Sequence, residues 1–173
     1  DEVLMEKFFE AGTLTQEELV KGLAAATRAA KIYPLVCSSG LANIGAQPLM
    51  DAVLAYLPSP ADRPFMALAN GETVTKPADD KAPYAAFVWK TVADQFAGRI
   101  TMFRVYQGSH KADPTVGNAT QGTQERLGHL IALQGKTPTN VPEIKAGDIG
   151  AVAKLKDTKT NDTLADKGAG VAF

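Results

Sequence analysis

Apolar residues in the first part of the chain recur at the three- and four-residue spacing of an amphipathic helix. One such stretch includes Phe8 and ends at Gly12, a common helix stop. Thr15 followed three residues later by Glu18 is the capping-box pattern. In this pattern, each of the two side chains accepts a hydrogen bond from the backbone N–H of the other residue at the start of a helix. The pattern predicts a helix before Gly12 and a second helix from about residue 15 to Ala29.

The next segment changes from helical to strand-like and back. Residues 32–37 form a short apolar run that predicts a buried strand, with Pro34 restricting it to an early or edge position. Cys37, at the end of this strand, is expected to be a buried and unreactive side chain. A loop over 38–45 follows, and Pro48 then opens a helix that ends before Pro58. Helices, a strand, a loop and a closing helix are what the last portion of an α/β domain supplies.

From Pro58 onward, Pro, Ala, Asp and Gly dominate and periodicity disappears, which predicts an extended linker at a domain boundary. Short strand-like runs separated by turn residues follow at 86–92, 99–106, 124–133, 149–155 and 163–165. Such a series predicts an all-β barrel or sandwich. The resulting division is an α/β part at 1–60, a linker at 61–84 and a β-barrel at 85–173.

Composition excludes several classes of protein. The 173 residues are 45% apolar and 21% charged with a net charge of −1, which is typical of a globular chain without a global basic field. A single cysteine rules out a disulfide framework and a cysteine-cluster zinc site. No apolar stretch is long enough to cross a bilayer and no leader is evident, so a cytoplasmic monomer without a membrane partner is expected. The chain begins directly in a helical pattern and stops within the apolar run 171–173, so both ends are expected to be cuts in a longer protein.

The sequence offers no phosphate loop of the kind that nucleotide hydrolysis needs. No G-x-x-x-x-G-K-[ST] occurs, and Gly135-Lys136-Thr137 has only its last three letters, with Leu130 where the first glycine belongs. His110 and His129 are expected on a loop and a strand surface, without metal-pair spacing. Trp89 is expected in the core. This chain is therefore predicted to be catalytically silent, with no catalytic residue and no metal ligand.

Cationic side chains are the remaining candidates for chemistry. Alternation along a strand predicts that Lys154 and Lys156 point to one face, as a strip that binds phosphate without reading sequence. The other reading is that these lysines keep the barrel surface soluble and protect its edges. Candidates for pairing with RNA phosphates are Arg99, Arg104, Arg126, Lys154, Lys156 and Lys159.

Strings in a fixed order make the chain resemble elongation factor G-like translational GTPases. They are DEVLMEKFFE at 1–10; PLVCSSG at 34–40 with GAQPLMDAV at 45–53 and YLPSP at 56–60; GR at 98–99 with RVYQG at 104–108; and AGDIGAV at 146–152 with LKDT at 155–158 and DTL at 162–164. Ser39-Gly40 stands where the family has Ser-Ala, and 134–141 lacks the His/Asn-rich character of the housekeeping factor, which points to a paralogue.

The resemblance implies a fold and a set of roles. It implies that 1–60 end a P-loop GTPase domain and that 85–173 form the domain II barrel. Ser39, Gly40 and Leu41 are then a remnant of the guanine-contacting loop, used with GTP or GDP and Mg²⁺ only in the parent protein. The barrel is expected to dock on small-subunit ribosomal RNA through Arg99, Arg104, Lys154, Lys156 and Lys159, and to contact the rest of the GTPase domain and domain III.

A rival hypothesis comes from a different class of protein. A small barrel has many uses, so the chain could hold a small ligand inside a barrel capped by the front helices, away from the ribosome. This hypothesis requires an enclosed pocket lined by convergent polar groups. The sequence shows no catalytic pair, no nucleophile with a base and no metal cluster that favours it.

Overall fold

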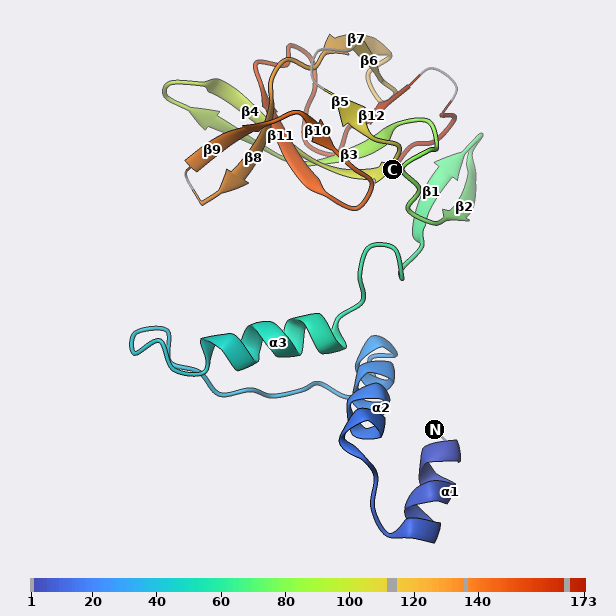
Figure 1. Cartoon of the computed structure of the whole chain (residues 1–173). Helices are drawn as coiled ribbons and strands as arrows, with labels where there is room; N and C mark the ends of the chain where they lie inside the picture. The colour runs from blue at the N-terminus through green and yellow to red at the C-terminus, as the bar shows by residue number, and fades with distance from the viewer. Residues whose placement is uncertain (1, 112–114, 136, 167–168) are drawn as a thin grey trace. The chain divides into compact units, whose positions relative to one another are not determined.

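The chain consists of two compact units, Asp1–Ser59 and Pro60–Phe173. Figure 1 shows helices in the first unit and strands in the second. The computed structural model describes residues 2–111, 115–135, 137–166 and 169–173. No helix in these ranges combines the length and apolar content needed to cross a membrane.

The first unit contains the three predicted helices, α1 (Glu2–Ala11), α2 (Gln16–Arg28) and α3 (Ala46–Tyr56). The capping box is present: the backbone N–H of Glu18 donates to Oγ1 of Thr15 at 3.4 Å, and the Glu18 carboxylate accepts the backbone N–H of Thr15 at 2.9 Å. Gly45 precedes α3 with a φ of 74°. A Cβ there would lie 2.6 Å from the carbonyl oxygen of Cys37, so glycine is required on two grounds.

The predicted strand at 32–37 is wrong. The segment is extended but belongs to no sheet, and Leu35 is 91% exposed. Cys37 is also exposed rather than packed in a core. A strand needs a neighbouring strand to accept its backbone hydrogen bonds, and the described part of the first unit contains none.

An antiparallel eight-stranded sheet dominates the second unit, in the order β7-β6-β12-β3-β4-β11-β8-β9. A two-stranded pair, β5 with β10, and the β1–β2 hairpin complete it. The strands are β1 (Phe65–Ala69), β2 (Glu72–Lys76), β3 (Ala85–Asp94), β4 (Gly98–Gln107), β5 (His110–Lys111), β6 (Thr115–Asn118), β7 (Thr123–Arg126), β8 (Leu130–Gln134), β9 (Thr137–Val141), β10 (Glu143–Ile144), β11 (Ile149–Ala153) and β12 (Thr163–Ala165). The prediction of a mainly β second part is confirmed.

The core lies on one face of this sheet. Alternate residues of β3 and β4, such as Ala86 and Val88 with Phe103 and Val105, are fully buried there. Leu127, Leu130, Val152, Leu155 and Leu164 join the same cluster. Apolar side chains therefore fill the interior where the ligand-binding rival expects a pocket lined by polar groups.

A smaller cluster covers the opposite face of the sheet. Phe65 of β1 packs against Tyr106 of β4 with ring centroids 4.8 Å apart, and against Phe173 at 5.6 Å. The backbone of Leu68 exchanges two hydrogen bonds with Ala172, at 2.7 and 2.8 Å. These contacts place the β1–β2 hairpin inside the second unit.

Several details differ from the predictions. The range 61–84, expected to be an extended linker, contains the β1–β2 hairpin, whose short strands lack a long alternating pattern. The run at 124–133 is two strands, β7 and β8, separated around Gly128. Trp89 is 43% exposed because it sits at a bulge: Val88 pairs with Phe103 and Lys90 with Met102, which leaves Trp89 without a partner.

Candidate nucleic-acid interface

The connection between β11 and β12 carries the main concentration of predicted cations. We call residues 154–160 the basic loop; it contains Lys154, Lys156 and Lys159 against one acid, Asp157. The predicted strand ends earlier than expected, at Ala153, because Lys154 takes a left-handed φ of 66°. The alternation rule therefore does not apply to Lys154 and Lys156, which lie beyond the end of β11, and their joint contact with phosphate stays a prediction.

A buried carboxylate anchors the first half of the basic loop. Glu125 of β7 is only 3% exposed, and its oxygens accept the backbone N–H groups of Lys156, Asp157 and Thr158 at 3.1, 2.7 and 2.9 Å. The Thr158 hydroxyl donates to the same carboxylate at 2.9 Å. Burial works to raise the pKa of Glu125, but these hydrogen bonds outweigh it and leave the pKa below its usual value. The carboxylate is thus held charged as a fixed acceptor.

A second buried carboxylate anchors the other half. Asp162 accepts the backbone N–H of Lys159 at 2.8 Å and the side-chain amides of Asn118 and Gln121 at 2.8 and 3.0 Å. The Asn118 amide also reaches Oγ1 of Thr158 at 3.3 Å. Burial of Asp162 opposes ionisation, yet the bonds from Asn118, Gln121 and Lys159 lower its pKa. Both halves of the loop are therefore held by charge-assisted hydrogen bonds.

Arg99 takes a structural part in the same loop. Its guanidinium Nη2 donates to the carbonyl oxygens of Leu155 and Lys156, both at 2.5 Å. The Leu155 side chain itself is buried in the core. Arg99 is therefore at the loop, as predicted, but part of its hydrogen-bonding capacity is already used by the protein.

The anchored backbone presents charged side chains outward. Lys154, Lys156 and Lys159 are exposed, while the alternating Leu155 and Thr158 are buried. Since the loop conformation is already fixed, little backbone entropy remains to be lost when an anion binds. Three ammonium groups on a rigid loop suit contact with phosphates, which they recognise by charge and not by base.

Arg104 does not belong to this group. It lies five positions after Arg99 on β4, which is an odd number of residues, so the two side chains leave opposite faces of the strand. Their Cα atoms are separated by roughly 16 Å along the strand. The Arg104 guanidinium lies over the Tyr106 ring, with Cζ 5.4 Å from the ring centroid. The predicted set of five cations is thus divided into two places on the second unit.

The predicted guanine-loop residues lie in the first unit. Ser39 and Ile44 exchange backbone hydrogen bonds at 2.8 and 3.1 Å, which closes a tight turn over 40–43 before α3. The Ser39 Oγ accepts the backbone N–H of Ala42 at 3.3 Å. A Cβ on Gly40 would meet nothing within 4 Å, and Leu41 is fully exposed. The turn is therefore open at Gly40 and Leu41, and contact of this loop with guanine stays a prediction.

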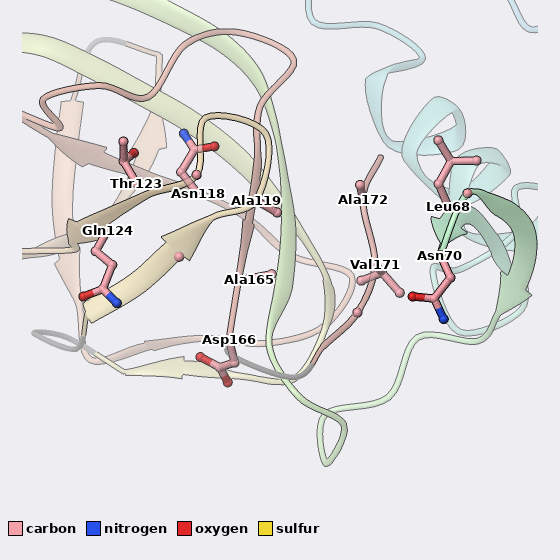
Figure 2. A pocket seen from close by; sticks show the side chains of 14 residues that line it. Leu68, Asn70, Asn118, Ala119, Thr123, Gln124, Ala165, Asp166, Val171 and Ala172 are labelled. Atoms are coloured by element: carbon pink, nitrogen blue, oxygen red, sulfur yellow. The ribbon is translucent and has the colours of Figure 1, made fainter.

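Other potential sites are less suited to phosphate. A hollow of about 630 Å³ lies in the second unit. Figure 2 shows Asn118, Thr123 and Gln124 on one side of it and Leu68 and Asn70 of the β1–β2 hairpin on the other. Asp166 is the one ionisable side chain among the described residues that line it, so its charge disfavours phosphate. Within the ranges that the structure describes, no three His, Cys, Asp or Glu side chains gather as a metal site. Lys136, which belongs to the incomplete match to a phosphate loop, lies outside the described residues.

Sequence reasoning missed the residues that shape the basic loop. Glu125 stands between Gln124 and Arg126 at the polar start of a strand-like run, and Lys156 and Asp162 are more than 30 positions away in sequence. A polar residue inside a strand pattern is the available signal, since a buried carboxylate needs several donors. His110 was also misplaced: it is 3% exposed, with its ring 4.4 Å from that of Tyr84.

The second unit is an antiparallel, barrel-like β module that carries an anchored loop with three exposed lysines. Residues 83–167 match the family Elongation factor G domain 2. A crystal structure of a protein from Thermus thermophilus is similar at 31% identity with a TM-score of 0.72, over 96% of this chain and 23% of that one. The chain belongs to the elongation factor G-like translational GTPases and contains their domain II. It spans about a quarter of the length of that solved protein.

Proposed function

We propose that the second unit docks on small-subunit ribosomal RNA through the basic loop. The observation that carries this proposal is the double anchoring of the loop by Glu125 and Asp162, which leaves Lys154, Lys156 and Lys159 exposed on a fixed backbone. Surface lysines that only confer solubility need no such scaffold. Phosphate contact gains from it because a preorganised charge loses less entropy on binding.

In the whole protein, the barrel would couple the state of bound nucleotide to domain arrangement. On this proposal, 1–60 are the last part of the GTPase domain, 61–84 lead from it into the second unit and include the β1–β2 hairpin, and 85–173 are domain II. GTP or GDP with Mg²⁺ binds elsewhere in the parent, with Ser39, Gly40 and Leu41 next to the guanine. The parent acts as a cytoplasmic GTPase during translation, as a monomer, and its domain II also contacts domain III.

Binding of the chain to purified small ribosomal subunits tests the docking proposal. The logarithm of the binding constant falls linearly with the logarithm of salt concentration, by about 0.7–0.9 for each phosphate contact. The double variant Lys156→Gln with Lys159→Gln should therefore weaken binding and reduce the slope by about 1.4–1.8. Affinity is measured by cosedimentation or anisotropy across a range of potassium chloride concentrations.

A matched control separates local from global charge. Lys21→Gln with Lys31→Gln removes the same two charges from exposed positions of the first unit. It should leave the salt slope unchanged. Equal slopes for the wild-type chain and the Lys156/Lys159 variant would remove the basic loop from the interface.

A further inference from the structure

The face of the sheet that carries Arg104 contains a separate cationic pocket. A cavity of about 340 Å³ lies inside the second unit, and its lining includes Pro60, Arg63, Phe65, Arg104, Tyr106 and Gly147. Two arginines and two aromatic rings therefore meet in one concavity. Its volume is in the range of sites that hold a small ligand.

Tight packing fixes one wall of this pocket. Gly147 has a φ of 94°, and a Cβ at that position would lie 2.6 Å from Cβ of Pro60. The backbone N–H of Gly147 donates to the carbonyl oxygen of Val105 at 2.7 Å, beside Arg104 on β4. Pro60 is thus held against the sheet, and the pocket is part of the fold rather than a gap at a loose end.

Arg104 lines this pocket and also carries an unsatisfied donor. Its Nε is buried and has no hydrogen-bond partner among the described residues. A buried donor without an acceptor is costly, and the cost is larger for a charged group. The guanidinium is positioned by Tyr106, whose ring lies 5.4 Å from Cζ. This arrangement leaves a positioned N–H group that needs an acceptor.

The electrostatics of the lining favour an anion. Arg63 is exposed and lines the same cavity, and no Asp or Glu is among the described lining residues. Of the described residues, none forms an ion pair with Arg63 or Arg104. Two uncompensated guanidinium groups at one concavity match the charge and the oxygen acceptors of phosphate.

We propose that this pocket is a phosphate-binding site in which Arg104 Nε and the Arg63 guanidinium hold the phosphate oxygens. The phosphate belongs either to a small phosphorylated ligand or to the backbone of an RNA strand. The site is independent of the basic loop, because Arg104 leaves the opposite face of β4 from Arg99.

Nuclear magnetic resonance of the Arg104 side chain tests the proposal directly. The Nε–Hε signal of Arg104 in the whole 173-residue chain is followed while inorganic phosphate is added at constant ionic strength, with chloride as the replaced anion. The Arg104 signal should shift and saturate, whereas the signal of Arg99, which donates to Leu155 and Lys156, should stay in place. Arg63→Gln should weaken phosphate binding about tenfold.

Further variants keep the result interpretable. Arg104→Lys retains the charge but lacks the Nε donor, so it should weaken phosphate binding about tenfold. Because this variant has no Nε–Hε signal, binding is measured from the backbone amide signals around Gly147. Lys156→Gln with Lys159→Gln should leave phosphate binding at this pocket unchanged, so this proposal and the docking proposal fail separately. A shift that never saturates, or one equal in the wild-type chain and Arg63→Gln, overturns the assignment.

Two nucleotides distinguish the sources of the phosphate. Uridine 5′-monophosphate offers a terminal phosphate, and uridylyl-uridine offers only a phosphodiester. Saturable binding of the monophosphate alone assigns the pocket to a small phosphorylated ligand. Equal binding of both assigns it to an RNA strand, and failure of both overturns the proposal.

Discussion

The Glu125 carboxylate accepts the backbone N–H of Asp157 at 2.7 Å across 32 positions of sequence. This bond joins strand β7 to the loop that follows β11. The two segments are brought together only when the sheet has formed, so the shape of the basic loop depends on tertiary folding. The lysines that we propose for RNA contact thus depend on a carboxylate that is itself buried.

Replacing the Glu125 carboxylate should destabilise the chain and the basic loop together. In Glu125→Gln, an amide NH₂ would face backbone N–H groups that now have a carboxylate acceptor, which costs about 1–3 kcal/mol. Urea unfolding measures the loss. Glu72→Gln, at an exposed position of β2, is the matched control and should change stability little.

The lowered pKa of Glu125 predicts that the folding stability of the chain decreases at acidic pH. Because hydrogen bonds lower the folded-state pKa of Glu125 below 4.5, the unfolded chain takes up the proton first as pH falls. The stabilisation is complete above pH 4.5 and is lost as pH falls through the folded pKa. In Glu125→Gln the fall in stability below pH 4.5 should be shallower, although Asp162, whose pKa is also lowered, maintains part of it. An unchanged profile would contradict the assignment.

Burial of His110 predicts a second fall in folding stability, at a higher pH than the one due to Glu125. Burial lowers the pKa of its imidazole below 6.5, partly offset by the negative charge of Asp166. The unfolded chain therefore binds the proton first, and stability present above pH 6.5 should be lost progressively as pH falls below it. Melting temperatures at about pH 7.5 and about pH 5.5, on either side of the ordinary histidine pKa, measure this effect. His110→Phe should reduce the difference between the two, and an undiminished difference would contradict it.

Two glycines with the same backbone conformation should differ sharply on substitution. Gly108 and Gly122 have φ values of 70° and 68°. A Cβ on Gly108 would lie 2.7 Å from both the carbonyl oxygen of Ala82 and Cα of Tyr84, whereas one on Gly122 meets nothing within 4 Å. Gly122→Ala should cost only the left-handed strain, about 1–2 kcal/mol. Gly108→Ala should cost clearly more in urea unfolding, because backbone atoms must move; equal costs would contradict this geometry.

The capping box gives a prediction for the first unit. Hydrogen bonds from Lys7 and from Thr15 lower the pKa of Glu18 to about 2, so the carboxylate is charged at neutral pH. Thr15→Ala should make the Glu18 amide exchange with solvent about fivefold faster, since the loss of such a cap destabilises a helix. Thr13→Ala, two positions earlier, should not change that exchange rate.

Local patterns were sufficient where a few adjacent residues decide the outcome. The helix starting after Thr15 and the strands around 86–92 and 99–106 occur close to their predicted limits. Failures occurred where a distant partner decides. Residues 32–37 have strand-like composition but lack a neighbouring strand, and Trp89 is displaced from the core by a bulge against β4.

The candidate site also combines features set by the local sequence with features set by distant partners. The sequence alone supplied the cations of the basic loop, the missing phosphate loop and the resemblance to elongation factor G, because these follow from residue identity and order. Tertiary structure alone decided which cations lie near one another: β7 and the residue before β12 bring Glu125 and Asp162 to the loop, and the two faces of β4 separate Arg99 from Arg104. The reason is physical, since a side chain's partners are chosen by chain segments that fold against it and not by its neighbours in sequence.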